Sequence, residues 1–420
     1  MADILPHLQS AFGLFVLVAI AWALSEDHRN AFSWRLIAAG LGLQIALAAL
    51  LLEVPIARAG LVSLNALVDA LQAATRAGTS FVFGFAGGGD TPFEVTEPRN
   101  LVTLAFQVLP LVIVMSALSA LLWHWRVLPW IVKVFALGLQ KTMRIGGAVG
   151  VGAAANVFLG MIEAPLLIRP YLAKLTRSEL FMVFTVGLAT VSGTVLVLYA
   201  TILEPSVPGA VGHILVASLI SLPAAILTAR LMVPGDHATE AGAAVDGTYQ
   251  STMDALARGT EDGLKLYLGI VAMLVVIVAL VALANIVLGG FPDAAGAPLS
   301  VERIFGWAFA PLVWLFGVPW DEVGQAGALM GTKTILNEFI AYLNLAALPD
   351  DALGPRTRLI MVYAMCGFAN LGSVGMMIAA VSAMVPERRQ EVAELSLKAI
   401  VSGTLATGMT GAVVGLLPLN

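Results

Sequence analysis

The chain has 420 residues, of which 59% are hydrophobic and only 12% are charged, and its mean hydropathy is +0.92. Because an average soluble domain has about a quarter of its residues charged, this composition excludes a soluble globular protein and indicates a polytopic membrane protein. The formal net charge of −5 lacks the basic excess of a nucleic-acid-binding protein. Five scattered histidines and a single cysteine, Cys366, argue against a metal enzyme and a disulfide framework, and no resident cofactor is expected.

Apolar runs of spanning length recur along the chain and predict an all-α fold with about eight transmembrane helices. The first two runs lie at residues 9–25 and 37–52. Residues 57–83 have apolar side chains at helical spacing with polar ones on the other face, which predicts an amphipathic helix in the membrane interface. A third span is expected at 101–122, and the tryptophan-bearing, basic segment 124–147 after it suits a second interfacial helix.

Residues 146–170, GGAVGVGAAANVFLGMIEAPLLIRP, do not have the composition of a continuous spanning helix. They are apolar enough for a bilayer, but they contain Asn156, Glu163, Pro165 and five glycines. An ionised carboxylate at the centre of a membrane costs several kcal/mol, and glycine and proline both weaken a helix. We therefore expect a re-entrant hairpin that is broken near its middle.

A second stretch has the same character. Residues 324–348, GQAGALMGTKTILNEFIAYLNLAAL, again combine small residues with Asn337 and Glu338 in an apolar context. Two glycine-interrupted hydrophobic segments at corresponding places in two halves are typical of the binding site of a transporter. The other expected elements are spans at 180–203, 213–232, 262–288, 359–384 and 392–417, a polar loop at 234–262, and a proline-broken interfacial segment at 291–322.

The order of these elements predicts an inverted repeat. In both halves a hairpin with Asn and Glu precedes an arginine-bearing turn, and the next helix reaches Gly-Leu-Ala-Thr190 or Gly-Phe-Ala-Asn370. Polar residues beside glycines near Thr190 and Asn370 predict unwound breaks, which survive at membrane depth only around protein or a polar pocket. The majority of short-loop Lys and Arg residues fall in the cytoplasm if both termini lie on the outer side.

Two carboxylates are the strongest candidates for functional residues. Glu163 and Glu338 could each accept two hydroxyl hydrogen bonds, couple to a proton or neutralise a cation. The alternative for each is a structural carboxylate bound to neighbouring backbone amides.

Neutral polar residues accompany them. Asn156 and Thr190, with carbonyls of an unwound segment, suit a sodium ion, although capping or a turn is the alternative. Asn370 and Ser373 offer donors and acceptors that suit a polyol such as a sugar, and the alternative is helix packing by small polar groups.

The segments GAAANVFLGMIEAPLLIRPYLAKLTRSEL and ILNEFIAYLNL with CGFANLGSVG resemble the signature segments of the concentrative nucleoside transporter family, from about residue 100 onward. The resemblance implies a homotrimer that moves nucleosides with sodium or protons by an elevator-like movement of a transport domain against a scaffold. It implies that Glu338, Asn370 and Ser373 hold the ribose, with Phe368 nearby. Sodium would be held by Asn156 and Thr190 together with carbonyls near Leu159 and Val191.

The resemblance also implies a division of the chain into five parts. Scaffold spans with interfacial helices occupy 1–143, and the first hairpin with the fourth span occupies 144–203 as part of the transport domain. Spans five and six with a cytoplasmic loop occupy 204–300. The second hairpin and seventh span occupy 301–385 in the transport domain, and the eighth span occupies 386–420.

The chain departs from the family pattern at one place. After Gly160 the family usually has Gln and then Thr or Ser before the glutamate, and these side chains contact the nucleobase. Here Met161 and Ile162 precede Glu163. The loss of about 1 to 3 kcal/mol per unmet buried polar group predicts weaker discrimination among bases or a different substrate, such as a purine or modified nucleoside.

These features together predict a multi-pass symporter of the bacterial inner membrane that imports nucleosides with sodium, or with protons. The alternative is a symporter of the same architecture for a different small polar solute, because Met161 and Ile162 are apolar. A hydrolase is not expected, since neither hairpin has a histidine to act as a base. A channel would conduct without a coupled ion.

Overall fold

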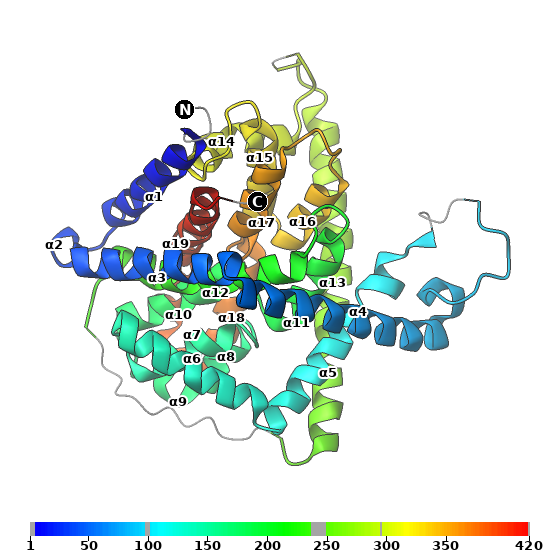
Figure 1. The fold of residues 1–420 in the computed structure, drawn as a ribbon, viewed down its shortest axis with the longest axis horizontal. Helices are drawn as coiled ribbons and strands as arrows, with labels where there is room; N and C mark the ends of the chain where they lie inside the picture. Colours follow the sequence, from blue (N-terminus) through cyan, green and yellow to red (C-terminus); the bar gives the residue numbers. More distant parts are fainter. Residues whose placement is uncertain (1–4, 97–100, 237–248, 295, 419–420) are drawn as a thin grey trace.

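The computed structural model describes residues 5–96, 101–236, 249–294 and 296–418, and in these ranges its regular structure is helical without a sheet (Figure 1). The all-α prediction is therefore confirmed. The polar loop predicted at 234–262 lies partly outside the described residues, at positions 237–248.

A peripheral set of helices has little of its surface buried. It comprises α1 (Leu5–Ala23), the short α2 (His28–Ala31), α3 (Trp34–Glu53), α4 (Pro55–Phe83), α5 (Leu111–His124) and α13 (Thr252–Leu288). None of the most apolar window of α13 is buried, although this is the most hydropathic of the candidate spans. Such a helix needs lipid or another chain around it.

Two glycines set the packing of α13 against α5. A Cβ at Gly259 would lie 2.6 Å from the Cβ of Ala120, and one at Gly263 would lie 2.8 Å from the Cα of Ile113. Only glycine lets the two backbones approach this closely.

The inner bundle is formed by α10 (Arg177–Ala189), α11 (Gly193–Leu203), α12 (Ala210–Met232), α17 (Pro355–Met365), α18 (Leu371–Met384) and α19 (Arg389–Leu416). The apolar windows of α10 with α11, α12 and α19 are 89%, 83% and 83% buried, in contrast to α13. Hydroxyl contacts join these helices: Ser221 lies 2.8 Å from Thr410, which also accepts a hydrogen bond of 3.1 Å from Gln44 on α3. This bundle is the core of the molecule.

Both predicted hairpins are interrupted helices. The first is α7 (Gly147–Asn156) and α8 (Glu163–Leu167), and the second is α15 (Val323–Ile335) and α16 (Glu338–Ala347). Each follows an amphipathic helix that packs against its first arm, α6 (Val127–Met143) or α14 (Val301–Leu315) (Figure 1). Re-entry of both hairpins into the membrane stays a prediction.

The two halves of the chain repeat one order of elements. A peripheral helix, an amphipathic helix, a hairpin, a two-part helix and a long inner helix occur as α5 to α12 and again as α13 to α19. The equivalent helices α5 and α13 pack together, and so do α12 and α19. Contacts between equivalent elements are what a two-fold relation between the repeats produces.

The predicted spans differ from the structure mainly at their ends. Seven helical segments in the described ranges are long and apolar enough to cross a membrane, and the remaining predicted span, 359–384, is the pair of half helices α17 and α18. The sixth span starts at Thr252, earlier than expected, and the third starts with a π-helical turn, Leu104–Val108. His7 Nδ1 lies 3.2 Å from the Gly415 carbonyl, so both ends of the described chain lie together.

Three short elements complete the description. They are the 3₁₀ turns Gly84–Gly87 and Pro386–Arg388, and the single helical turn α9 (Arg169–Leu172).

Candidate substrate and ion site

Two helix breaks meet in the inner bundle. The backbone is extended at Thr190 between α10 and α11 and at Asn370 before α18. The Phe368 N–H donates a 3.4 Å hydrogen bond to the Thr190 carbonyl, so each break supplies a partner for the other. A Cβ at Gly367 would lie 2.8 Å from the Leu188 carbonyl, which explains glycine at this crossing. The predicted unwound breaks are confirmed, and they lie side by side.

The first hairpin docks on the break in α10 and α11. Its own break, between Asn156 and Glu163, contains Gly160 with a φ of 112°, a conformation that favours glycine. The Gly193 N–H donates a 3.2 Å hydrogen bond to the Phe158 carbonyl. A polar backbone group in the break of the hairpin is thus satisfied by protein, which non-helical backbone needs wherever water is excluded.

The second hairpin places Glu338 in the first turn of α16. Asn337 caps this helix by accepting a 2.9 Å hydrogen bond from the Ile340 N–H. Glu338 is 3% exposed, and its two oxygens accept hydrogen bonds from the Tyr199 hydroxyl at 2.7 Å and the Asn370 amide at 2.9 Å. The carboxylate is therefore held from two sides, by α11 and by the break before α18.

Asn370 extends this cluster to Ser373. The Asn370 Oδ1 accepts a 2.7 Å hydrogen bond from the Ser373 N–H, and Ser373 is buried. Glu338, Asn370 and Ser373, which were far apart in the sequence, are brought together. Each carboxylate oxygen of Glu338 retains capacity for a further hydrogen bond, so this cluster can accept sugar hydroxyls.

Asn156 and Thr190 also meet. The Asn156 Nδ2 donates to Thr190 Oγ1 and, at 3.2 Å, to the Val186 carbonyl, while Thr190 Oγ1 donates to the same carbonyl at 3.0 Å. The Asn156 Oδ1 is buried and has no hydrogen-bond partner among the described residues. A buried oxygen without a partner is unfavourable by about 1 to 3 kcal/mol, and a cation would satisfy it.

The other residues predicted to hold the ion would contribute neutral backbone carbonyl oxygens. Leu159 lies in the break of the first hairpin, and Val191 lies in the break between α10 and α11, where its N–H donates a 3.0 Å hydrogen bond to Ser218. In the described ranges no group of three or more His, Cys, Asp or Glu residues could hold a metal ion. A set of neutral oxygens suits an alkali cation better than a transition metal.

The tip residues of the first hairpin have different surroundings from one another. Met161 is buried against α10, since a Cβ on Gly187 would lie 3.2 Å from its Cβ, whereas Ile162 is half-buried and Glu163 is exposed. A Glu163 oxygen lies 3.1 Å from the Cβ position of Gly160. Within the described part of the chain no hydrogen bond joins Glu163 to Glu338.

Two residues of this region escaped sequence reasoning. Tyr199, which donates to Glu338, is the only aromatic residue with a hydroxyl in the apolar segment GTVLVLYATIL, and that isolation was its signal. Lys333 is fully buried in the last turn of α15, five positions before Glu338 in the sequence. A lysine within a predicted hairpin is a signal of the same kind.

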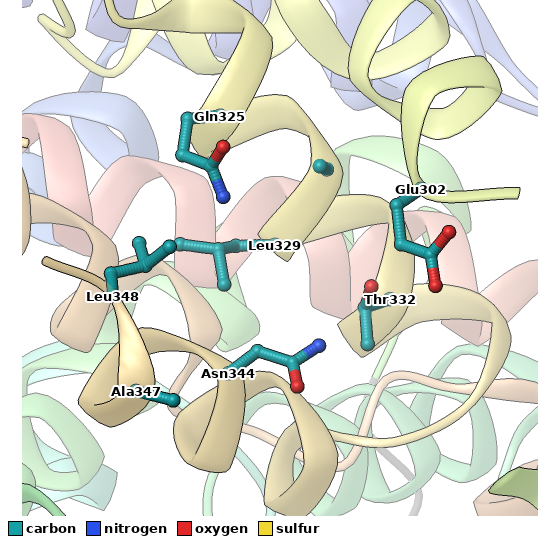
Figure 2. Close-up of a pocket in the computed structure, with 8 residues that line it drawn as sticks. Glu302, Gln325, Leu329, Thr332, Asn344, Ala347 and Leu348 are labelled. Atoms are coloured by element: carbon teal, nitrogen blue, oxygen red, sulfur yellow. The ribbon is translucent and has the colours of Figure 1, made fainter. Parts of the chain in front are cut away.

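A separate cavity lies between α14 and the arms of the second hairpin. Its volume is about 250 Å³, and Figure 2 shows Gln325, Thr332, Asn344 and Glu302 directed toward the same space. The predicted substrate and ion residues do not line it. The cavity is therefore distinct from the cluster around Glu338.

Comparison with known proteins gives the class to which this architecture belongs. Three family profiles match: "Na+ dependent nucleoside transporter N-terminus" at residues 12–86, "Nucleoside recognition" at 105–206, and "Na+ dependent nucleoside transporter C-terminus" at 213–415. The chain thus belongs to the concentrative nucleoside transporter family. It is a membrane transporter and not an enzyme.

Relatives and solved structures match over nearly the whole chain. An uncharacterized transporter of Bacillus subtilis, YutK, is 35% identical over 97% of this chain and 99% of its own. The nucleoside permease NupC of Helicobacter pylori is 34% identical over 98% of both chains. The structure of CNTnw in an inward-facing substrate-bound state is 37% identical, covers 97% of both chains and has a TM-score of 0.89.

Proposed function

We propose that this chain is a secondary active symporter that imports nucleosides across the bacterial inner membrane, driven by a sodium gradient. The observation that carries the proposal is the Glu338 carboxylate, buried where the second hairpin meets the two helix breaks and held by Tyr199 and Asn370. An acid at this depth is expensive unless function requires it.

The chemistry of the Glu338 cluster supports a sugar. An ionised carboxylate accepts two hydroxyl hydrogen bonds side by side, as the 2′ and 3′ hydroxyls of a ribose present them. Asn370 and Ser373 beside it add donors and acceptors in the same place. The names of relatives support a nucleoside, since they include a nucleoside permease and, in the rat, a sodium/nucleoside cotransporter that is 32% identical.

The unpartnered Asn156 Oδ1 supports sodium as the coupling ion. It lies beside Thr190 in a site of neutral oxygens, and the hydrogen bond from Phe368 to Thr190 connects this site to the break that carries Asn370. Sodium at this place would tighten the contact between the two breaks on which the sugar site rests. Its binding would thereby favour substrate binding.

The movement we propose is an elevator. The buried inner bundle with both hairpins would move as a transport domain against the peripheral helices, with both termini on the outer side of the membrane. This chain resembles CNTnw in an inward-facing state with a TM-score of 0.89 and a CNTnw variant in an outward-facing state with a TM-score of 0.88. The unburied apolar surface of α13 supports a homotrimer whose subunits meet at this helix.

A second candidate is a symporter of the same architecture for a different small polar solute. It is favoured by one observation, the apolar tip of the first hairpin, where Met161 is buried and Ile162 is half-buried. The sugar side of the site would then be retained, and the other side of the substrate would differ.

Uptake by the purified protein in proteoliposomes tests both candidates. Radiolabelled uridine, cytidine, adenosine and free ribose are offered with an inward sodium gradient, with choline in its place, and with an inward proton gradient. We expect concentrative nucleoside uptake with sodium only. Uptake with choline and a proton gradient would overturn sodium coupling, and the absence of uptake of any nucleoside would overturn the substrate class.

A further inference from the structure

Lys333 is a buried cation without a hydrogen-bond partner. Its side chain is 0% exposed, and its ammonium group finds no hydrogen-bond acceptor within the described residues. Burial of an ammonium group is strongly unfavourable unless an opposite charge or hydrogen bonds compensate it. The transport mechanism proposed above gives Lys333 no role.

The opposite charge near Lys333 is Glu338. The two are not joined by a hydrogen bond, but only the two-residue break between α15, which ends at Ile335, and α16, which begins at Glu338, separates the helices that carry them. Lys333 lies in the last turn of α15, where a helix favours cations, and Glu338 lies in the first turn of α16, where a helix favours anions. The break therefore arranges two helix ends and two charges so that each charge stabilises the other.

Other titratable groups near this pair are uncharged or engaged elsewhere. Tyr199 from α11, Tyr342 from α16 and Cys366 from the break before α18 face it and carry no charge near neutral pH. On α14, Glu302 is bound by Asn285, and Arg303 donates to carbonyls of the preceding loop. Arg358 on α17 donates to the carbonyl of Leu345 in the last turn of α16 and to that of Leu353 in the loop after it. Among these groups of the described chain, Lys333 is thus the cation that no hydrogen bond engages.

We infer that Lys333 is a positioning residue for substrate binding: its ammonium group is a built-in counter-charge that keeps the Glu338 carboxylate ionised and able to accept sugar hydroxyls. This inference rests on the proposed function, because it takes Glu338 to be the sugar acceptor. A protonated Glu338 would lose one acceptor position to its own hydrogen. Lys333 acts through Glu338 and need not contact the substrate.

The pH dependence of nucleoside binding tests this role. Lys333→Met keeps the length and the apolar stem of the side chain and removes the charge, and Lys174→Met, at an exposed lysine, is the matched control. Uridine or adenosine binding to the full chain in detergent is measured by calorimetry from about pH 6 to about pH 9. We expect Lys333→Met to bind about tenfold more weakly than the parent at the acidic end and to recover toward it at the alkaline end, because a carboxylate without a counter-charge takes up a proton more readily.

A purely structural role for Lys333 gives a different result. Its loss would then weaken binding by the same factor at every pH, and this outcome would overturn the inference. Equal binding by Lys333→Met and the parent across the range would overturn it as well. Failure of the parent to bind any nucleoside would instead reject the proposed function.

A double-mutant cycle on thermal stability needs no nucleoside and covers the case in which Lys333→Met folds poorly. The melting temperatures of the parent, Lys333→Met, Glu338→Gln and the double variant are compared in detergent. If the charges balance one another, Glu338→Gln restores part of the stability lost in Lys333→Met, because no charge is left uncompensated. Additive losses, or a double variant that folds no better than Lys333→Met, would refute the counter-charge.

Discussion

The two hairpins are built on one plan and differ in how they hold their acid. In the second, Glu338 is buried, bonded to Tyr199 and Asn370, and balanced by Lys333. In the first, Glu163 is exposed, and α7 has no basic residue in its last turn. Both hairpins thus contain the acid, but only the second hairpin holds its side chain in place.

This difference divides the proposed site into two parts that differ in how much variation in the substrate they should tolerate. The part around Glu338 is preorganised, since its partners come from α11 and the break before α18 and are already in place. The part around Glu163 is open and apolar at its tip, so that its contacts with a substrate form during binding. We therefore expect the second hairpin to recognise the constant sugar and the first to set preference for the variable base.

The largest expected effect is the contrast between Glu338→Gln and Glu163→Gln. Loss of a buried charged acceptor removes charge-assisted hydrogen bonds worth together about 3 kcal/mol, so uptake through Glu338→Gln should fall at least about a hundredfold. Glu163→Gln should cost about tenfold, because water can replace its contacts. Initial uptake rates in proteoliposomes, normalised to the amount of folded protein, measure both. Equal losses of uptake in the two variants would contradict the proposed difference in role between the two hairpins.

Sodium dependence should separate the ion site from the sugar site. Asn156→Ala removes the unpartnered Oδ1, and we expect half-maximal uptake to require about tenfold more sodium, equivalent to about 1.4 kcal/mol. Asn30→Ala, which removes an exposed amide that donates to Asp27 outside the proposed site, is the matched control. An unchanged sodium requirement in Asn156→Ala would place the ion elsewhere.

Tyr199→Phe tests how far the preorganisation of Glu338 matters. The phenylalanine keeps the packing against Phe339 and Tyr342 but removes the hydrogen bond to the carboxylate, for an expected loss of about 1 kcal/mol, or about fivefold in nucleoside affinity. Tyr267→Phe on α13 should leave affinity unchanged. Stronger binding by Tyr199→Phe would show instead that Tyr199 competes with the sugar for Glu338.

Base preference should change more on substitution of Ile162 than on substitution of Met161, the two residues at the tip of the first hairpin. Ile162→Thr places a hydroxyl on a half-buried side chain and should shift the ratio of uridine to adenosine uptake by about fivefold. Met161→Gln should mainly lower the melting temperature, because it buries an amide against Gly187. A change in base preference from Met161→Gln alone would mean that this tip rearranges when substrate binds.

The sequence could predict the elements and most of the proposed site because the bilayer constrains composition so strongly. Glycine, proline and single polar residues in apolar runs stand out, and they marked the hairpins, the breaks at Thr190 and Asn370, and Glu338. It could not predict which residues touch, since contacts between distant segments depend on tertiary packing. The bond from Tyr199 to Glu338, the burial of Met161 and the exposure of Glu163 are of this kind.

The smallest expected effect concerns the turns that follow the hairpins. After the first hairpin, Arg177 binds the Glu26 carboxylate at 2.9 Å and Lys398 binds the same carboxylate at 3.1 Å. After the second, Arg356 binds neutral groups, the carbonyls of Gly317 and Gly415. The Arg177 contact should therefore make stability depend on pH in the acidic range, whereas the Arg356 contacts should not.

The direction in which stability changes with pH follows from the pKa of Glu26. Hydrogen bonding from Arg177, followed by the contacts of Lys398, lowers this pKa below its usual value of 4.5 although partial burial opposes the change. The unfolded state then binds the proton more readily, so the stabilisation is fully present above 4.5 and is lost as the pH falls through the folded-state pKa. Since the pair is partly exposed, Glu26→Gln should lower the melting temperature by only about 1 to 2 °C near pH 7. That difference should vanish as the pH falls through the folded-state pKa of Glu26, whereas the loss caused by Arg356→Met should stay constant over the same range, because its partners are carbonyls that do not titrate.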